Sequence, residues 1–305
     1  MKKTELTYSG APCRLDVFLS VAGEKYSRSF ARKLAEQGLA LVNGSPRKPA
    51  YMLTDGDTVQ VSLPGAGKEQ AGFEDLVLFE DKHLLAVAKP AGIAVHPNPA
   101  NWEVNPETSL LGEPTLVSMI YAARPAMAEL ERLGLVHRLD RDTSGLLLLA
   151  KTHESQDILK KGFRERLMEK TYIGAVTGIP AKKTGLIDAP IGRASGFKKI
   201  KVWEYGREAV TEYTVIEKGK GCALLSLHPM TGRTNQIRIH LEHIGHPIMG
   251  DKLYGGPDAP RMLLHSLRLV FSHPVTGKET RLEAPLPHDF KAAWAAVKSG
   301  KYPQK

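Results

Sequence analysis

The chain has 305 residues, 42% of them hydrophobic, and carries 42 Lys and Arg against 33 Asp and Glu, a net charge of +9. No apolar run approaches the roughly 20 residues that span a bilayer, and no secretory signal follows the opening MKKTELTYSG. The two cysteines, Cys13 and Cys222, form neither a CxxC pair nor a disulfide framework. We therefore expect a cytoplasmic protein without metal or membrane partner, whose basic excess favours nucleic acid.

The length favours two domains, since a domain commonly holds about 100 to 200 residues. The stretch PGAGKEQAG, over 64–72, is rich in glycine and polar residues and lacks any apolar period, which is typical of a connector. The sequence predicts a small domain over 1–63, a linker over 64–72 and a larger domain over 73–305.

The small domain is predicted to contain two short helices followed by strands. Apolar residues recur at helical spacing over 15–19, and a second helix is expected over 27–37, with Ser27 as its cap and Gly38 as its stop. Strands are expected over 39–42 and 58–63, the first of which ends in a tight Asn-Gly turn.

The exposed face of the second helix would carry Arg28, Arg32 and Lys33. Such a group of charges is usually an ordinary solvated face.

The larger domain is predicted to begin with a hairpin over 76–79 and 84–88. KPAGIAVHP follows, and its prolines and glycine would present Lys89 and His96 near strand ends, where either could contact substrate. A purely structural role is equally open for His96. An irregular loop should then lead to a helix that starts near Thr115.

The nine residues HRLDRDTSG, over 137–145, are the most informative stretch, and an apolar strand over 146–150 follows them. Asp140 and Asp142 lie among two arginines and a histidine, which indicates a site for a polyanion with one reactive acid. The same residues also suit a plain turn, because Asp and Ser cap their own backbone and Gly145 permits unusual dihedrals.

Two later strands are expected, over 170–176, which carries Tyr172, and over 223–227. After the second, TGRTNQIRIHL predicts a helix that is capped by Thr234 and ends at Gly245. Arg233 at its entrance opposes the helix dipole, which calls for a compensating anion, either a phosphate or a carboxylate of the protein. Asp140 is a candidate for that anion.

These motifs occur in the order found in the RluA family of pseudouridine synthases, which the chain resembles: KPAGIAVHP, GLVHRLDRDTSGLLLLAK, EKTYIGAV, TGRTNQIRIHL and GHPIMGDKLYG. The run SRSFARKLAEQGLALVNG resembles the alpha-L RNA-binding motif of a ribosomal protein. That resemblance implies that the basic face with Arg28, Arg32 and Lys33 contacts the RNA backbone, which positions a protein without reading sequence. The resemblance implies an α+β fold with a mixed, largely antiparallel central sheet flanked by helices. It also implies isomerisation of uridine in RNA without cofactor or metal.

The resemblance further implies roles for individual residues. Asp140 matches the essential aspartate, a nucleophile or electrostatic partner when the glycosidic bond breaks. Tyr172 matches a tyrosine that packs on the target base and removes a proton, Arg233 an arginine that pairs with the aspartate, and Arg138 an arginine that fills the stack vacated by a flipped uridine. Asn235 departs from the family, in which many members have histidine.

The combination of domains resembles enzymes that modify large-subunit ribosomal RNA, and we expect a monomer that binds this RNA. A tRNA pseudouridine synthase and a non-catalytic RNA-binding factor are the alternatives. A glycoside hydrolase that uses Asp140 and Asp142 is disfavoured by the basic charge and by an aromatic content of only 7%.

Overall fold

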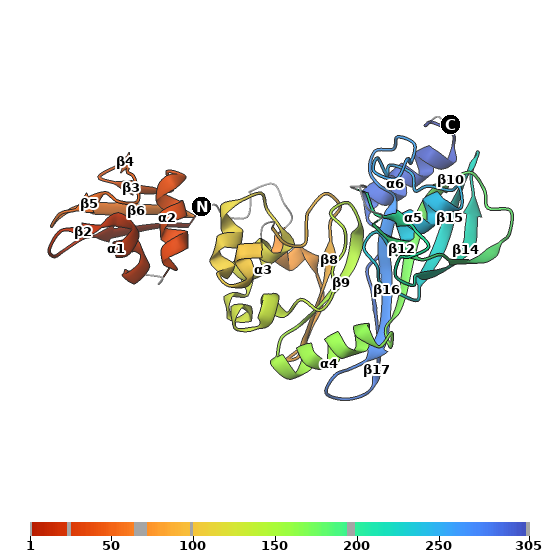
Figure 1. The fold of residues 1–305 in the computed structure, drawn as a ribbon, viewed down its shortest axis with the longest axis horizontal. Helices are drawn as coiled ribbons and strands as arrows, with labels where there is room; N and C mark the ends of the chain where they lie inside the picture. The colour runs from red at the N-terminus through yellow and green to blue at the C-terminus, as the bar shows by residue number, and fades with distance from the viewer. Residues whose placement is uncertain (1, 23–25, 64–71, 98–99, 194–198, 303–305) are drawn as a thin grey trace. The chain divides into compact units, whose positions relative to one another are not determined.

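The computed structural model describes residues 2–22, 26–63, 72–97, 100–193 and 199–302 (Figure 1). The chain divides into two compact units, Met1–Asp75 with Val95–Leu133, and Leu76–Ala94 with Gly134–Lys305. The expected connector falls almost entirely outside the described residues. The expected boundary differs in one respect: residues 95–133 group with the first unit, because Leu110 and Leu111 pack against its core.

The first unit begins with two helices and short antiparallel strands. They are β1 (Lys2–Thr7), β2 (Cys13–Arg14), α1 (Leu15–Val21), α2 (Arg28–Glu36), β3 (Ala40–Val42), β4 (Ser45–Pro46), β5 (Met52–Leu53) and β6 (Thr58–Leu63). One sheet has the order β1-β6-β3-β4, and β2 pairs with β5. The helices and the later strands confirm the predicted elements, whereas β1 was not predicted.

Local chemistry explains where α2 starts and stops. The Ser27 hydroxyl accepts a hydrogen bond from the Phe30 N–H at 3.3 Å, as an N-cap does. Gly38, just past the helix, has a φ of 69°, which glycine adopts without strain. Phe30 and Leu34 are fully buried, so the opposite face of α2 is left to its charged residues.

The remainder of the first unit is built from short helices. These are the 3₁₀ helices η1 (Phe73–Leu76), η2 (Ala100–Glu103), η3 (Pro106–Leu111), η4 (Pro125–Glu129) and η5 (Glu131–Gly134), and the α-helix α3 (Leu116–Ala123). Thr115 and Ser118 cap α3 reciprocally through side chain and backbone, which confirms the helix start expected there.

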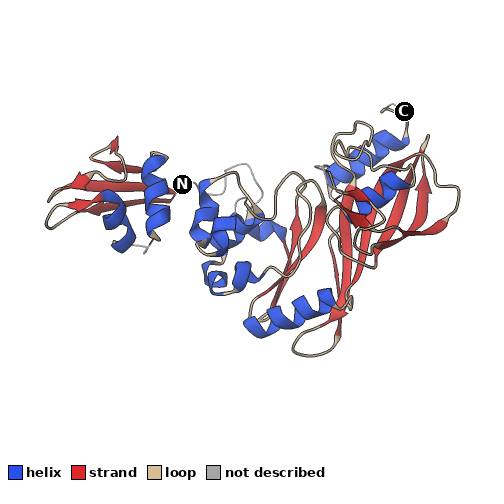
Figure 2. Ribbon diagram, viewed as in Figure 1, coloured by secondary structure: helices blue, strands red, loops and turns tan. Residues whose placement is uncertain are grey.

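The second unit is built on a sheet of nine strands, and strands are drawn in red in Figure 2. Eight of them follow the order β11-β14-β15-β10-β16-β9-β8-β7, and the ninth, β17, pairs with β16. All pairs are antiparallel except β16 with β9, which confirms the predicted mixed sheet. The strands of this sheet are β7 (Val77–Glu80), β8 (Leu84–Lys89), β9 (Ser144–Ala150), β10 (Glu169–Thr177), β11 (Thr184–Asp188), β14 (Val210–Lys218), β15 (Cys222–Pro229), β16 (Leu264–Ser272) and β17 (Glu279–Glu283).

The helices α4 (His153–Arg164), α5 (Gln236–His243) and α6 (His288–Lys298) cover the sheet, and a small ribbon of β12 (Ile191–Gly192) with β13 (Lys201–Val202) lies apart from it. Alternate residues of β15 face different helices. Leu225 and Leu227 share a core with Ile237 and Leu241 of α5, whereas Leu224 packs with α6. Within the described ranges, every helix is too short or too polar to span a membrane.

Candidate active site

A pocket of about 530 Å³ lies in the second unit at the side of β10 and the start of α5. It contains four of the residues predicted from the sequence, Arg138, Asp140, Tyr172 and Arg233. Its further charged residues are basic, and they come from α4, the loop after it, β10 and α5: Arg164, Arg166, Lys170 and Arg238. Among the described residues that line it, Asp140 is the sole carboxylate.

Asp140 begins a tight turn that the Thr143 N–H closes onto the Asp140 carbonyl at 3.2 Å. β9 starts directly afterwards with Ser144 and Gly145, which pair in parallel with His265 and Ser266 of β16. Gly145 has a φ of 113°, and a Cβ there would lie 2.2 Å from the Ser266 carbonyl oxygen. Only glycine therefore allows β9 to approach β16 this closely, which fixes the turn beside the sheet.

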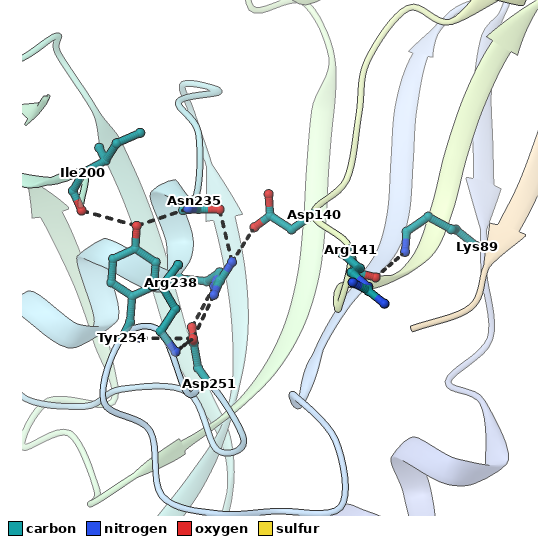
Figure 3. A network of polar contacts seen from close by, with 9 residues as sticks. Lys89, Asp140, Arg141, Ile200, Asn235, Arg238, Asp251 and Tyr254 are labelled. Atoms are coloured by element: carbon teal, nitrogen blue, oxygen red, sulfur yellow. Dashed lines mark hydrogen bonds and ion pairs between the residues drawn. The ribbon is translucent and has the colours of Figure 1, made fainter. Parts of the chain in front are cut away.

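Arg238 on α5 holds the Asp140 carboxylate (Figure 3). Its Nη1 donates to Asp140 Oδ2 at 3.2 Å, while Nε and Nη2 donate to the two oxygens of Asp251 at 2.7 and 2.8 Å. The side chains of Arg238 and Asp251 are 9% and 1% exposed, against 25% for Asp140. A buried bidentate pair thus anchors the guanidinium and leaves one nitrogen to reach the more accessible carboxylate.

This geometry corrects the expected partner of Asp140. Arg233 instead donates from Nε to the Glu208 carbonyl at 2.9 Å, although it still lines the pocket. Arg238 meets Asp140 because α5 begins at Gln236, which places it within the first turn. The predicted cap was also wrong, because Asn235 is the N-cap residue in place of Thr234. The predicted stop is confirmed: the helix ends at His243, and Gly245, with a φ of 80°, follows the C-cap residue Ile244.

The sequence interpretation missed Arg238, Asp251 and Tyr254, and it noted Asn235 only as a departure from the family. Asp251 and Tyr254 follow Gly250 in a tight turn, in which Asp251 Oδ1 accepts from the Leu253 and Tyr254 N–H groups. Asn235 contacts both Arg238 and Tyr254. All lie within the TGRTNQIRIHL and GHPIMGDKLYG motifs. No rule of sequence spacing pairs an arginine of the first motif with an aspartate of the second, so the sequence did not reveal the contact.

Tyr172 lies where the pairing of β10 with β16 is irregular. The register shifts between Thr171 and Tyr172, which pair with Arg268 and Ser266, so the extra residue is Leu267 of β16. Such irregularities are common beside active sites. Burial raises the pKa of Tyr172 to about 12, and the negative charge of Asp140 acts in the same direction, while Ser266 opposes it. The phenol therefore keeps its proton at neutral pH.

His137, the first residue of HRLDRDTSG, has a structural place. Its Nε2 accepts a hydrogen bond from the Leu148 N–H at 2.8 Å, and its ring stacks on Phe163 with centroids 4.6 Å apart. Burial lowers the pKa of His137 to about 3, so the ring stays neutral and can accept that bond. It thereby ties the turn to β9.

Lys89, predicted to contact RNA, is buried instead, with 1% of its surface exposed. Its Nζ donates to the carbonyl oxygens of Pro90, Ile93 and Arg141, each at 2.8 Å (Figure 3 shows the last contact). An ammonium has three donors, and all three are used here. Burial lowers the pKa of Lys89 to about 7, against the charges of Asp142 and Asp140, which raise it. Lys89 therefore joins the 90–93 turn to the Asp140 turn.

We expect Lys89→Met to lower the free energy of unfolding by about 2 to 4 kcal/mol, because it leaves three carbonyl oxygens without donors. Urea denaturation measures this loss. The exposed Lys82 is the matched control, since Lys82→Met should change stability by less than about 0.5 kcal/mol. A Lys89→Met protein that is fully stable but binds RNA with a weaker salt dependence would restore the original prediction of an RNA contact.

The remaining predicted RNA-binding residues lie in the first unit. Arg28 and Arg32 are exposed on α2 and Lys33 is half-buried, with Arg32 paired to Glu36 at 2.7 Å. His96 stacks on Trp102 with centroids 5.5 Å apart, and its Nδ1 lies 3.1 Å from the Pro97 carbonyl. In the part of the chain that the structure describes, no group of three or more His, Cys, Asp or Glu side chains could hold a metal ion.

Comparison with known proteins links this geometry to a family. A family model described as RNA pseudouridylate synthase matches residues 83–243, and one described as S4 domain matches residues 13–59. "Ribosomal large subunit pseudouridine synthase D" of Nitrosomonas europaea is 35% identical over 95% of this chain and 86% of its own length. An uncharacterized RNA pseudouridine synthase of Bacillus subtilis is 35% identical over 90% of this chain and 91% of its own.

Among solved structures, human RNA pseudouridylate synthase domain containing 4 is similar in fold, with a TM-score of 0.58 and 24% identity. The match covers 74% of this chain and 94% of the human chain. The two family matches, the identity with whole-length relatives and the shared fold agree. The chain therefore belongs to the RNA pseudouridylate synthase family, as an isomerase with an N-terminal S4 domain.

Proposed function

We propose that this enzyme isomerises specific uridines of large-subunit ribosomal RNA, with Asp140 as the residue that acts on the ribose. The observation that carries the proposal is the place of Asp140, a lone carboxylate among the described residues of a basic pocket. Such a pocket suits a polyanionic substrate and one reactive acid. The relatives of Nitrosomonas europaea and Xanthomonas campestris, both named ribosomal large subunit pseudouridine synthase D, support the choice of RNA.

In the proposed reaction the bond from uracil N1 to ribose C1′ breaks while Asp140 attacks C1′ or stabilises positive charge on it. The freed uracil turns until its C5 faces C1′, and a C5–C1′ bond forms as any bond to Asp140 breaks. A proton leaves C5 and N1 ends protonated, so no atom is gained or lost and no cofactor is needed. In this proposal the Tyr172 ring packs on the base, and its phenol oxygen accepts the proton that leaves C5.

The pocket is reached by a base that leaves its stack, and this costs a few kcal/mol. Arg138 is exposed and lines the pocket, and its planar guanidinium is suited to stack in the space that the uridine vacates. Arg233 and Lys170 would contact neighbouring phosphates. Burial beside Arg166 lowers the pKa of Lys170 to about 8, so it is still largely charged at neutral pH.

Mapping of pseudouridine in total RNA from cells with and without the protein tests the proposal. We expect sites in large-subunit ribosomal RNA to disappear without the protein, and purified enzyme to restore them in that RNA. Loss of sites in tRNA alone would refute the substrate assignment. An unchanged map, with RNA still bound by the purified protein, would favour the non-catalytic binding factor.

We expect Tyr172→Phe to lower the isomerisation rate roughly 10² to 10⁴-fold with little loss of RNA affinity, because the ring remains and the proton carrier is gone. Since the pKa of Tyr172 is raised to about 12, its ionised fraction grows tenfold with each pH unit across the neutral range. The rate of wild type in single turnovers should rise from pH 6 to 9. A flat profile would argue against Tyr172 as the base.

The basic face of α2 is expected to contribute to RNA affinity through phosphate contacts. Changing Arg28, Arg32 and Lys33 together to Gln should weaken binding and reduce the slope of log K against log salt by roughly 0.7 to 0.9 per lost contact. Filter binding at several salt concentrations measures this slope. An unaltered slope would identify the three residues as a solvated face.

The cytoplasmic location and the monomeric state of the protein stay predictions.

A further inference from the structure

Asn235 occupies an unusual position directly before α5. Its backbone has a φ of 56° and a ψ of 20°, the left-handed region that asparagine tolerates better than most residues. As the N-cap residue of α5 it makes no side-chain capping bond to the helix. The Asn235 side chain instead makes hydrogen bonds to other side chains.

The Asn235 amide bridges two buried residues (Figure 3). Its Oδ1 accepts a hydrogen bond from Arg238 Nη1 at 3.1 Å, and its Nδ2 donates to Tyr254 Oη at 3.1 Å. Tyr254 is 1% exposed and donates its hydroxyl proton to the Ile200 carbonyl at 3.3 Å. Because the tyrosine proton is committed to that carbonyl, Oη can only accept from Asn235, and the amide oxygen must face Arg238.

The contact at Nη1 decides where Arg238 points. The guanidinium is planar, Nε and Nη2 are held by Asp251, and Nη1 has two hydrogens. One of them goes to Asn235 Oδ1 and the other to Asp140 Oδ2. The Tyr254 ring lies under the same guanidinium, 5.0 Å from its carbon. Fixing the first hydrogen on Asn235 therefore directs the second at Asp140.

We propose that Asn235 is a positioning residue for isomerisation, which holds Arg238 in the plane that presents Nη1 to Asp140. This inference rests on the proposed function, in which Asp140 acts on the ribose. An amide does not titrate between pH 4 and 10, so this contact is independent of pH across that range. The charged or titratable groups around it are Arg238 from α5, Asp140, Asp251 and Tyr254 from turns, and Lys199, which lies 4.3 Å over the Tyr254 ring.

Asn235→Gly is the cleanest test, since glycine keeps the left-handed backbone while it removes both contacts. We expect kcat on large-subunit ribosomal RNA to fall roughly 10-fold to 100-fold with KM within about twofold of wild type. In a crystal structure of the variant, Arg238 Nη1 should move out of hydrogen-bond distance of Asp140. Nη1 still at its wild-type distance would overturn the proposal whatever the activity, and so would an unchanged kcat.

Asn43→Gly is the matched control, because Asn43 is also left-handed, with a φ of 50°, and lies in a hairpin of the first unit. It carries the same loss of side chain and the same added glycine. We expect it to alter stability without altering kcat. An equal fall in kcat for both variants would show a general effect of glycine and would refute the positioning role.

Asn235→His provides a readout that a merely structural role would not move. A neutral imidazole has one acceptor and one donor and can replace both amide contacts, whereas a protonated ring has only donors and opposes Arg238. We expect the variant to approach wild-type kcat at pH 8 and to lose activity as the pH falls through about 6.5 more steeply than wild type, whose rate follows the ionisation of Tyr172 alone. Identical pH profiles would contradict the proposal.

Failure of the proposed function and failure of the positioning role of Asn235 give different experimental results. Wild-type enzyme without activity on any RNA would refute the function, while the variant structure still decides whether Asn235 positions Arg238. Wild-type activity that Asn235→Gly fully retains would leave the function intact and refute the inference alone.

Discussion

Replacing Asp140 by asparagine is expected to lower pseudouridine formation at least about 10³-fold, because an amide can neither attack the ribose C1′ nor balance positive charge on it. RNA affinity should stay within about threefold of wild type, since the basic residues of the pocket remain. Arg238 also remains anchored, because Asp251 holds it through two hydrogen bonds at 2.7 and 2.8 Å. Single-turnover assays and binding to the same RNA measure both quantities.

Asp142→Asn is the matched control, two residues further along the same turn. Asp142 is exposed and does not line the pocket, so its variant should keep nearly full activity. If Asp140→Asn retained turnover while Asp142→Asn lost it, the reactive carboxylate would be Asp142. A loss of RNA binding in Asp140→Asn would show instead that the carboxylate organises the pocket.

Much of the fold could be predicted because its signals are local. The cap at Ser27, the stop at Gly38, the hairpin before Lys89 and the alternation around Tyr172 each depend on a few neighbouring residues. The N-terminal β1 pairs with β6 more than fifty residues away, and nothing in its own sequence marks it strongly as a strand. Residues 95–133 group with the first unit through packing against its core, which the sequence does not reveal.

The site shows the same division between local and distant information. Asp140 was identified from a turn dense in charge, and the structure places it in the pocket with Tyr172. Its cation was assigned wrongly, because the choice between Arg233 and Arg238 depends on where α5 begins. Lys89 was predicted to contact RNA because the turn at Pro90 and Gly92 would present it near a strand end, whereas its three carbonyl partners come from two separate turns.

The second large effect is expected for Arg238→Met. Removal of the guanidinium leaves the Asp251 carboxylate, which is 1% exposed, as an unpaired buried charge, and this should cost about 3 to 5 kcal/mol of unfolding free energy. Asp140 also loses its cation, so we expect activity to fall at least about 10²-fold even at temperatures where the variant is folded. Urea denaturation and single-turnover assays below the unfolding transition separate the two losses.

A second substitution distinguishes the roles of the buried pair. Asp251→Asn in the Arg238→Met background removes the unpaired charge, while the amide oxygen can still accept from the Leu253 and Tyr254 N–H groups. We expect it to restore part of the stability, about 1 to 3 kcal/mol, and none of the activity. Arg233→Gln should keep stability and reduce mainly RNA affinity. Should Arg233→Gln abolish turnover while Arg238→Met keeps it, the pairing of Arg238 with Asp140 would be structural alone, and Arg233 would be the arginine on which the reaction depends.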